Sequence, residues 1–168
     1  MKRIFLLLTV VAMTAFTGCS SDDDRIDNDT VGLVFDITRS FASDGTIEFP
    51  FNPGEVYSGD VVLIYWMEST TTSGNPVWRL IPQDFFFDNG GYLTYNYDFT
   101  TTEAIIYADT DQVLSSIPDF TQGQIFRIVV VPGQNPIFAK SANSSVDTKD
   151  YNATVTAYGI NDKNVQMR

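Results

Sequence analysis

The stretch that decides the fold is Val61-Val62-Leu63-Ile64-Tyr65-Trp66-Met67. Its residues are apolar at consecutive positions, so both faces of a strand formed here must be covered by other parts of the protein. A second run of the same kind is Ile125-Phe126-Arg127-Ile128-Val129-Val130-Val131, which stops at Pro132-Gly133. The two runs predict two central strands, around which the rest of the chain supplies the covering layers.

Other segments alternate between apolar and polar residues, as strands with one buried face do. Residues 33–37 and 47–51 show this pattern and flank a turn signal at Asp44-Gly45, which predicts a hairpin. Pro50 places the second of these strands at a sheet edge or at its own end. Further strands are predicted over residues 77–81, 92–99 and 104–108.

Seven or eight short strands with frequent turn signals predict an all-β protein, an antiparallel β-sandwich of the immunoglobulin-like or jelly-roll-like kind. The alternative of βαβ units needs helices between the strands, and none is indicated there. One helix is predicted near residues 148–158, with Asp147 as N-cap and Asp150 as a capping-box residue. Gly159 is placed to end it, with Val155 and Ile160 in apolar contact.

The N-terminal prefix ends at Cys19, the only cysteine of the chain. Residues 1–18 begin with Lys2 and Arg3 and continue with an apolar run that is too short for a membrane span of about 20 residues. An ordinary secretory signal would end in a small-residue site and would leave a lone cysteine at this place unexplained. Residues 16–19 resemble a lipobox, which implies lipidation at Cys19 and peptidase recognition at Phe16, Thr17 and Gly18.

A polar segment follows the cysteine. It resembles the acidic export signal of Bacteroidota-type surface lipoproteins, and its residues are Ser20, Ser21, Asp22, Asp23 and Asp24. We therefore predict a signal peptide over 1–18, a lipidated flexible tether over 19–30 and a single domain over 31–168. Residues 60–66, 78–87, 92–100 and 125–132 are similar to a group of small, uncharacterised lipoproteins of this type. That resemblance implies an outer-membrane location facing the cell exterior and implies no activity.

Composition narrows the possible functions. The chain has 10 Lys and Arg against 21 Asp and Glu, a formal net charge of −11, which excludes nucleic-acid binding through a basic surface. Histidine is absent and Cys19 is assigned to lipidation, so Ser-His and Cys-His catalytic sites and Cys/His zinc sites are excluded as well. We expect no cofactor.

Carboxylate chemistry is the remaining catalytic possibility, since a glycosidase needs two carboxylates about 5 to 9 Å apart. The acids that could supply such a pair are Glu48, Glu68, Asp84, Asp98 and Glu103. Asp109-Thr110-Asp111 has two carboxylates on one loop, but Gln112, Val113 and Leu114 follow where a calcium loop needs further oxygen ligands. A structural turn is the favoured interpretation of that loop.

Aromatic residues raise a binding hypothesis. Trp66, Trp78 and Tyr92 could form a platform that stacks on sugar rings, although aromatic residues in strands more often belong to the core. Tyr92 is the one expected to be exposed. Arg127, inside an apolar strand, is either a ligand clamp or, the favoured option, a structural partner of an acid such as Asp98.

Together these observations predict a non-catalytic, lipid-anchored module on the outer surface, with a binding or assembly role toward an envelope protein. The first alternative is a glycan-binding accessory protein of a polysaccharide-uptake system. A carboxylate-dependent hydrolase is the remote alternative.

Overall fold

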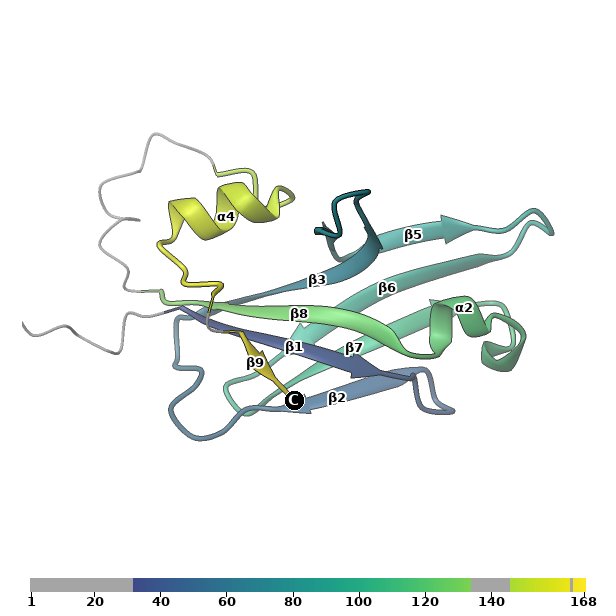
Figure 1. Cartoon of the computed structure of the whole chain (residues 1–168). Coiled ribbons are helices and arrows are strands. Elements are labelled where there is room, and N and C mark those ends of the chain that lie inside the picture. Colours follow the sequence, from purple (N-terminus) through teal and green to yellow (C-terminus); the bar gives the residue numbers. More distant parts are fainter. Residues whose placement is uncertain (1–31, 134–145, 164) are drawn as a thin grey trace, which may run out of the picture.

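A computed structural model describes residues 32–133, 146–163 and 165–168, and it shows two stacked sheets (Figure 1). Sheet A has the strand order β4-β3-β8-β1-β9, and sheet B has the order β2-β7-β6-β5. All strand pairs are antiparallel except β1 with β9. The prediction of an all-β, antiparallel sandwich is therefore confirmed.

The strands of sheet A are β1 (Leu33–Arg39), β3 (Val61–Thr70), β4 (Pro76–Leu80), β8 (Gln124–Val131) and β9 (Gln166–Met167). Those of sheet B are β2 (Thr46–Pro50), β5 (Gln83–Phe86), β6 (Tyr92–Phe99) and β7 (Glu103–Thr110). The two apolar runs form β3 and β8, which are interior strands of sheet A as predicted, and the two strands pair with each other. β2 is an edge strand and ends at Pro50, also as predicted.

The main core lies between the sheets and is rich in aromatic rings. Phe35 packs against Phe49, with ring centroids 5.3 Å apart, and Tyr95 lies 5.6 Å from Phe126. Along β6 the inward residues Leu93 and Tyr95 are fully buried, because alternate side chains of a strand point to opposite faces. Phe, Tyr and Trp residues thus supply much of the area that stabilises the sandwich.

The hairpin predicted between residues 33–37 and 47–51 is wrong. β1 pairs with β8 and β9 in sheet A, whereas β2 pairs with β7 in sheet B. The turn at Gly45, which has a φ of 80°, carries the chain from one sheet to the other, and the Ala108 N–H donates to the Gly45 carbonyl. A turn does form at the predicted position, but β1 and β2 do not pair with each other. Cross-strand packing and burial decide which strands pair, and here they favour other partners for both strands.

The C-terminal helix α4 (Tyr151–Ala157) begins later than predicted. Its N-cap is Asp150, whose side chain accepts from the Ala153 N–H at 3.1 Å, so the expected cap at Asp147 is wrong. The Thr148 carbonyl instead accepts from the Tyr65 hydroxyl at 2.8 Å, which places residue 148 in the connection before the helix.

The end of α4 agrees with the sequence. Gly159 has a φ of 62°, the Ile160 N–H donates to the Val155 carbonyl, and the Gly159 N–H donates to the Thr156 carbonyl. This pair of bonds is a Schellman motif, with Val155 and Ile160 in one apolar cluster.

A second short helical segment was not predicted. Between β7 and β8 the chain forms a 3-10 turn, η2 (Leu114–Ser116), followed by α2 (Pro118–Thr121). The buried Gln124 holds it in place, because its Nε2 donates to the Asp119 and Gln122 carbonyls at 2.9 Å each. Elements this short carry no apolar period that sequence analysis could detect.

Helix α4 covers part of the outer face of sheet A (Figure 1). Tyr151 and Ile160 pack there with Val34, Tyr65 and Val129 in a second apolar cluster. The Tyr65 hydroxyl oxygen also lies 3.1 Å from Thr154 Oγ1, within hydrogen-bonding distance, which joins the helix to the sheet. Docking of this kind is what stabilises a seven-residue helix, since so short a helix is unstable alone.

The predicted signal peptide, Cys19 and the tether all lie outside the described residues. In the described part of the chain, no helix has the length and apolar character needed to cross a bilayer.

Candidate functional site

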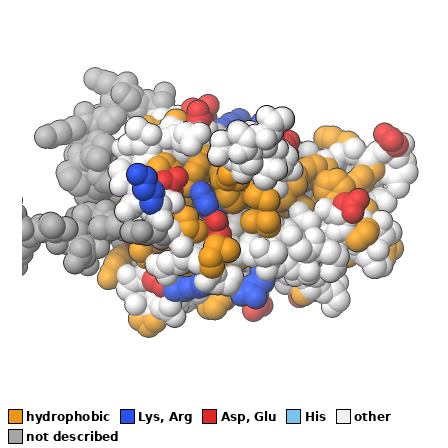
Figure 2. All heavy atoms as spheres, viewed as in Figure 1, with side chains coloured by type: hydrophobic (Ala, Val, Ile, Leu, Met, Phe, Trp, Pro, Cys, Tyr) orange, Lys and Arg blue, Asp and Glu red, His pale blue; other side chains and the backbone are white. Residues whose placement is uncertain are grey.

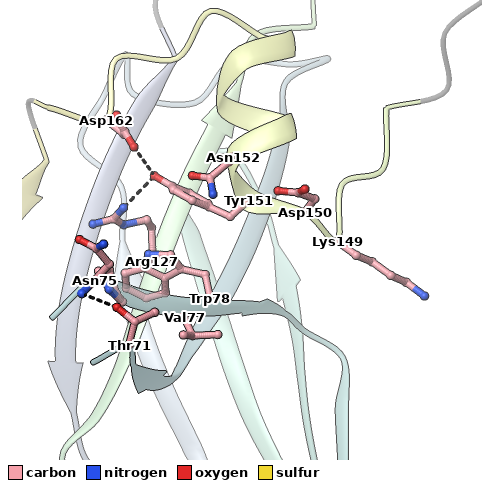
Figure 3. Close-up of a pocket in the computed structure, with 11 residues that line it drawn as sticks. Thr71, Asn75, Val77, Trp78, Arg127, Lys149, Asp150, Tyr151, Asn152 and Asp162 are labelled. Carbon is pink, nitrogen blue, oxygen red and sulfur yellow. Dashed lines mark hydrogen bonds between the residues drawn. The ribbon is translucent and has the colours of Figure 1, made fainter. Parts of the chain in front are cut away.

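A groove of about 670 Å³ opens where the start of α4 faces the β3–β4 turn and β4 (Figure 3). Its position follows from the fold, since α4 covers only part of sheet A (Figure 1), and the groove lies beside the first turn of the helix. The residues that line it are Thr71, Asn75, Pro76, Val77, Trp78, Arg127, Lys149, Asp150, Tyr151, Asn152 and Asp162.

Arg127 forms the inner end of the groove. It projects from β8, and its Nε and Nη2 donate to the two carboxylate oxygens of Asp36 at 2.7 Å each. Asp36 is the direct cross-strand partner of Arg127 in the β1–β8 register. The side chains of the two residues are only 11% and 14% exposed, so this is a largely buried, bidentate ion pair.

Two aromatic rings enclose the guanidinium group. The Arg127 Cζ lies 4.4 Å from the ring centroid of Trp78 and 5.1 Å from that of Tyr151. Arg127 Nη1 also donates to the Tyr151 hydroxyl at 2.8 Å, and that hydroxyl donates to Asp162 Oδ2 at 3.3 Å. Figure 3 shows this chain of contacts from Asp162 through Tyr151 to Arg127. Cation–π and hydrogen-bond contacts thus fix the side chains at the inner end of the groove.

The ionisation of these groups follows from burial and charge. Burial lowers the pKa of Arg127, but the hydrogen bonds that it donates to Asp36 and Tyr151, together with the charge interactions with both groups, outweigh this effect, so its pKa lies above the usual value. Burial raises the pKa of Tyr151 to about 12, although the nearby Arg127 opposes the rise. At neutral pH the groove therefore has a permanent cation and a protonated phenol at its inner end.

The outer walls are polar. In the β3–β4 turn, the Asn75 N–H donates to Thr71 Oγ1 at 3.0 Å, which presents both side chains at the rim. Asn152, Asp150 and Lys149 form the opposite wall, and in Figure 3 the Lys149 side chain extends away from the other residues. Because Arg127 and Lys149 are matched by Asp150 and Asp162, the lining has no net formal charge.

The predicted aromatic platform is not assembled. Trp78 lines the groove, whereas Trp66 packs inward against Phe85, with ring centroids 5.1 Å apart, and its Nε1 donates to Gln124 Oε1. Tyr92 is 36% exposed, but it lies on the outer face of sheet B. The three residues therefore lie in three separate places: the groove, the space between the sheets and the outer face of sheet B.

The prediction that Arg127 pairs with an acid is confirmed, but the acid is Asp36 and the suggested partner Asp98 is wrong. Asp98 belongs to β6 of sheet B and accepts from the Tyr107 hydroxyl at 3.1 Å, while Arg127 belongs to sheet A. Strand register explains the difference, because it places Asp36 directly beside Arg127 on the outer face of sheet A.

The other candidate acids lie apart from the groove. Glu68 forms an ion pair with Arg79 in sheet A, whereas Glu48, Asp84 and Glu103 belong to sheet B. Asp111 accepts from the Tyr92 N–H at 2.9 Å and thereby fastens the loop after β7 to β6. Within the described ranges, no three His, Cys, Asp or Glu side chains are gathered as a metal site would need.

The sequence predicts only part of the groove. It indicates Trp78 and Arg127 as candidate binding residues, but it predicts Tyr151 only as a helix residue and Asn75 only as part of a loop. The arginine inside an apolar strand predicts a buried acidic partner, since a buried cation requires one. The sequence does not indicate which distant segment supplies that partner.

Fold and groove together define a β-sandwich protein with a polar and aromatic surface groove. Comparison with known proteins finds no matching family model, no matching curated protein and no matching solved structure. The chemistry of the groove is therefore the basis for a functional proposal.

Proposed function

We propose that this chain is a lipid-anchored, non-catalytic binding module of the outer cell surface, and that the groove beside α4 is its ligand-binding site. The observation that carries the proposal is the groove itself. A volume of about 670 Å³ lies within the 300 to 1,000 Å³ common for ligand sites. Lipidation at Cys19 and the tether over 19–30 supply the anchoring, and they remain predictions from the sequence.

The rigidity of the groove supports binding. Arg127 is held by Asp36 on one side and by Trp78 and Tyr151 on the others, so the inner end is preformed. A preformed site avoids part of the entropy that a ligand must otherwise pay to order the side chains.

Among the binding roles predicted from the sequence, the lining of the groove favours glycan binding. It suits a neutral ligand with many hydroxyl groups. Trp78 supplies apolar ring surface, while Asn75, Asn152 and Asp162 supply hydrogen-bonding groups along the walls. The balanced charge of the lining gives no advantage to a strongly anionic or cationic ligand.

Native electrophoresis in gels that contain a polysaccharide tests this proposal. The full-length protein should migrate more slowly in gels with a neutral glucan, mannan or xylan than in gels without polysaccharide. A polyuronate gel should cause much less retardation. Normal migration with every neutral polysaccharide would refute the glycan-binding role.

Matched variants locate the site. Asn152→Ala removes an exposed side chain of the groove and should weaken retardation about tenfold, the effect of losing one good hydrogen-bonding group. Tyr92→Ser changes an exposed residue of the other sheet and should leave retardation unchanged. The opposite result would assign binding to sheet B and refute the groove as the site.

A further inference from the structure

Three apolar side chains are exposed near the β5–β6 hairpin. Phe86 is 82% exposed, Val113 is 71% exposed and Tyr92 is 36% exposed. We call these three residues, with Asp84, Asp88, Asp109 and Asp111, the hairpin surface. A large aromatic side chain as exposed as Phe86 lacks the stabilisation that burial would provide. Residues of this kind commonly mark a place where another molecule binds.

The backbone brings these residues together. Phe86 and Tyr92 are directly opposed in the β5–β6 register, and both point outward because their neighbours Phe85 and Leu93 pack into the core. Val113 follows a loop that is fastened to the hairpin, since Asn89 Nδ2 donates to Gln112 Oε1 at 3.0 Å. The exposed apolar groups therefore belong to one continuous end of the sandwich.

Acidic residues surround this apolar centre, and no basic residue accompanies them. Between Arg79 and Arg127 the chain has no Lys or Arg, although it contains Asp84, Asp88, Asp98, Glu103, Asp109, Asp111 and Asp119. Asp84 and Asp109 flank Thr94 in the row beside Phe86 and Tyr92. In Figure 2 the right-hand end of the molecule, to which the hairpin projects, shows acidic and hydrophobic side chains and no basic ones.

The position of the surface is also informative. The described chain enters at the start of β1, and the β5–β6 hairpin lies at the opposite end of the sandwich (Figure 1). A module tethered through its N-terminal segment would hold the hairpin surface farthest from its anchor.

We propose that the hairpin surface docks a partner polypeptide whose apolar centre is surrounded by Lys and Arg. An acidic rim around exposed aromatic and aliphatic groups favours such a partner by charge complementarity, which steers association and suppresses acidic competitors. A second copy of this chain has few cations to offer, because three of the six Lys and Arg side chains of the described residues, Arg79, Arg127 and Arg168, are already engaged with Glu68, Asp36 and Glu55.

A synthetic amphipathic peptide that alternates lysine with leucine is a suitable probe. Its binding to the full-length protein in mild detergent can be measured by fluorescence anisotropy at low and at physiological salt. We expect measurable binding that weakens about tenfold at the higher salt, because the acidic rim is solvent-exposed and screened. Failure of the wild-type protein to bind this peptide even at low salt would overturn the proposal.

Two pairs of variants separate a specific surface from general acidity. Phe86→Ser with Val113→Ser should weaken binding at least tenfold, as expected for apolar anchors at an interface. Tyr57→Ser with Val61→Ser, which changes two exposed apolar residues outside the hairpin surface, should leave it within twofold.

The second pair consists of two double variants that each remove two negative charges from sheet B, one inside the hairpin surface and one outside it. Asp84→Asn with Asp109→Asn should weaken binding and reduce its salt dependence, whereas Asp98→Asn with Glu103→Gln should have a much smaller effect. Equal effects of the two charge variants, or no effect of the Phe86 and Val113 changes, would overturn the proposal in favour of nonspecific attraction to an acidic protein.

Discussion

Arg127→Met is the most informative single substitution for stability. Methionine keeps the length and apolar character of the side chain but removes the guanidinium group. The Asp36 carboxylate then loses both of its 2.7 Å hydrogen bonds, and the Tyr151 hydroxyl loses its donor. The rings of Trp78 and Tyr151 also lose the cation between them. The variant therefore leaves a charge and a polar group without their partner beneath α4.

The magnitude follows from burial. Removing one partner of a buried ion pair costs about 3 to 5 kcal/mol, because the other charge remains desolvated. The side chains of Arg127 and Asp36 are 11% and 14% exposed, so some water still reaches the pair. We therefore expect a loss near the lower limit, about 3 kcal/mol, which for a domain of this size lowers Tm by about 10 °C.

Urea unfolding followed by tryptophan fluorescence measures the effect, and Arg79→Met provides the matched control. Arg79 also pairs with an acid, Glu68, at 2.9 Å, but the two side chains are 53% and 39% exposed. Exposed pairs contribute about 0 to 1 kcal/mol, so the same substitution there should hardly change the unfolding midpoint. Adding Asp36→Leu to Arg127→Met should recover about 2 kcal/mol, because it removes the stranded carboxylate.

Equal losses for Arg127→Met and Arg79→Met would refute this reasoning. So would a double variant no more stable than Arg127→Met, since the stranded carboxylate is the source of the expected cost.

Three further predictions address pH, the helix terminus and anchoring. Burial raises the pKa values of Tyr65 and Tyr151 to about 12, against about 10 in the unfolded chain, so their contribution to stability is complete below about pH 10 and is lost between about pH 10 and pH 12. Tyr151→Phe should make this alkaline loss smaller, which urea titrations across that range will measure. Gly159→Ala should cost about 1 kcal/mol because the φ of 62° strains a residue with a Cβ, and thermal unfolding checks this. Cys19→Ser should abolish palmitate labelling and release the protein from the membrane fraction, and membrane retention without label would contradict the lipid anchor.

Features that depend on neighbouring residues could be predicted from the sequence. The apolar runs over 61–67 and 125–131 had to be central strands, because nothing else buries both faces of an extended segment. The end of α4 at Gly159 was equally local, since a left-handed residue there favours glycine. The start of the same helix could not be predicted from neighbouring residues, because the Thr148 carbonyl accepts a hydrogen bond from Tyr65 of a distant strand.

The sequence by itself therefore determined the all-β class, the two central strands and the end of the C-terminal helix. Only the tertiary structure decided that β1 and β2 lie in different sheets and that Arg127 pairs with Asp36. It also decided that the β3–β4 turn, β8 and α4 enclose one groove, and that Phe86 and Val113 share one exposed end. Burial patterns and turns are encoded by residues close together in the chain, whereas register and contacts between layers depend on segments far apart, whose partners no local pattern specifies.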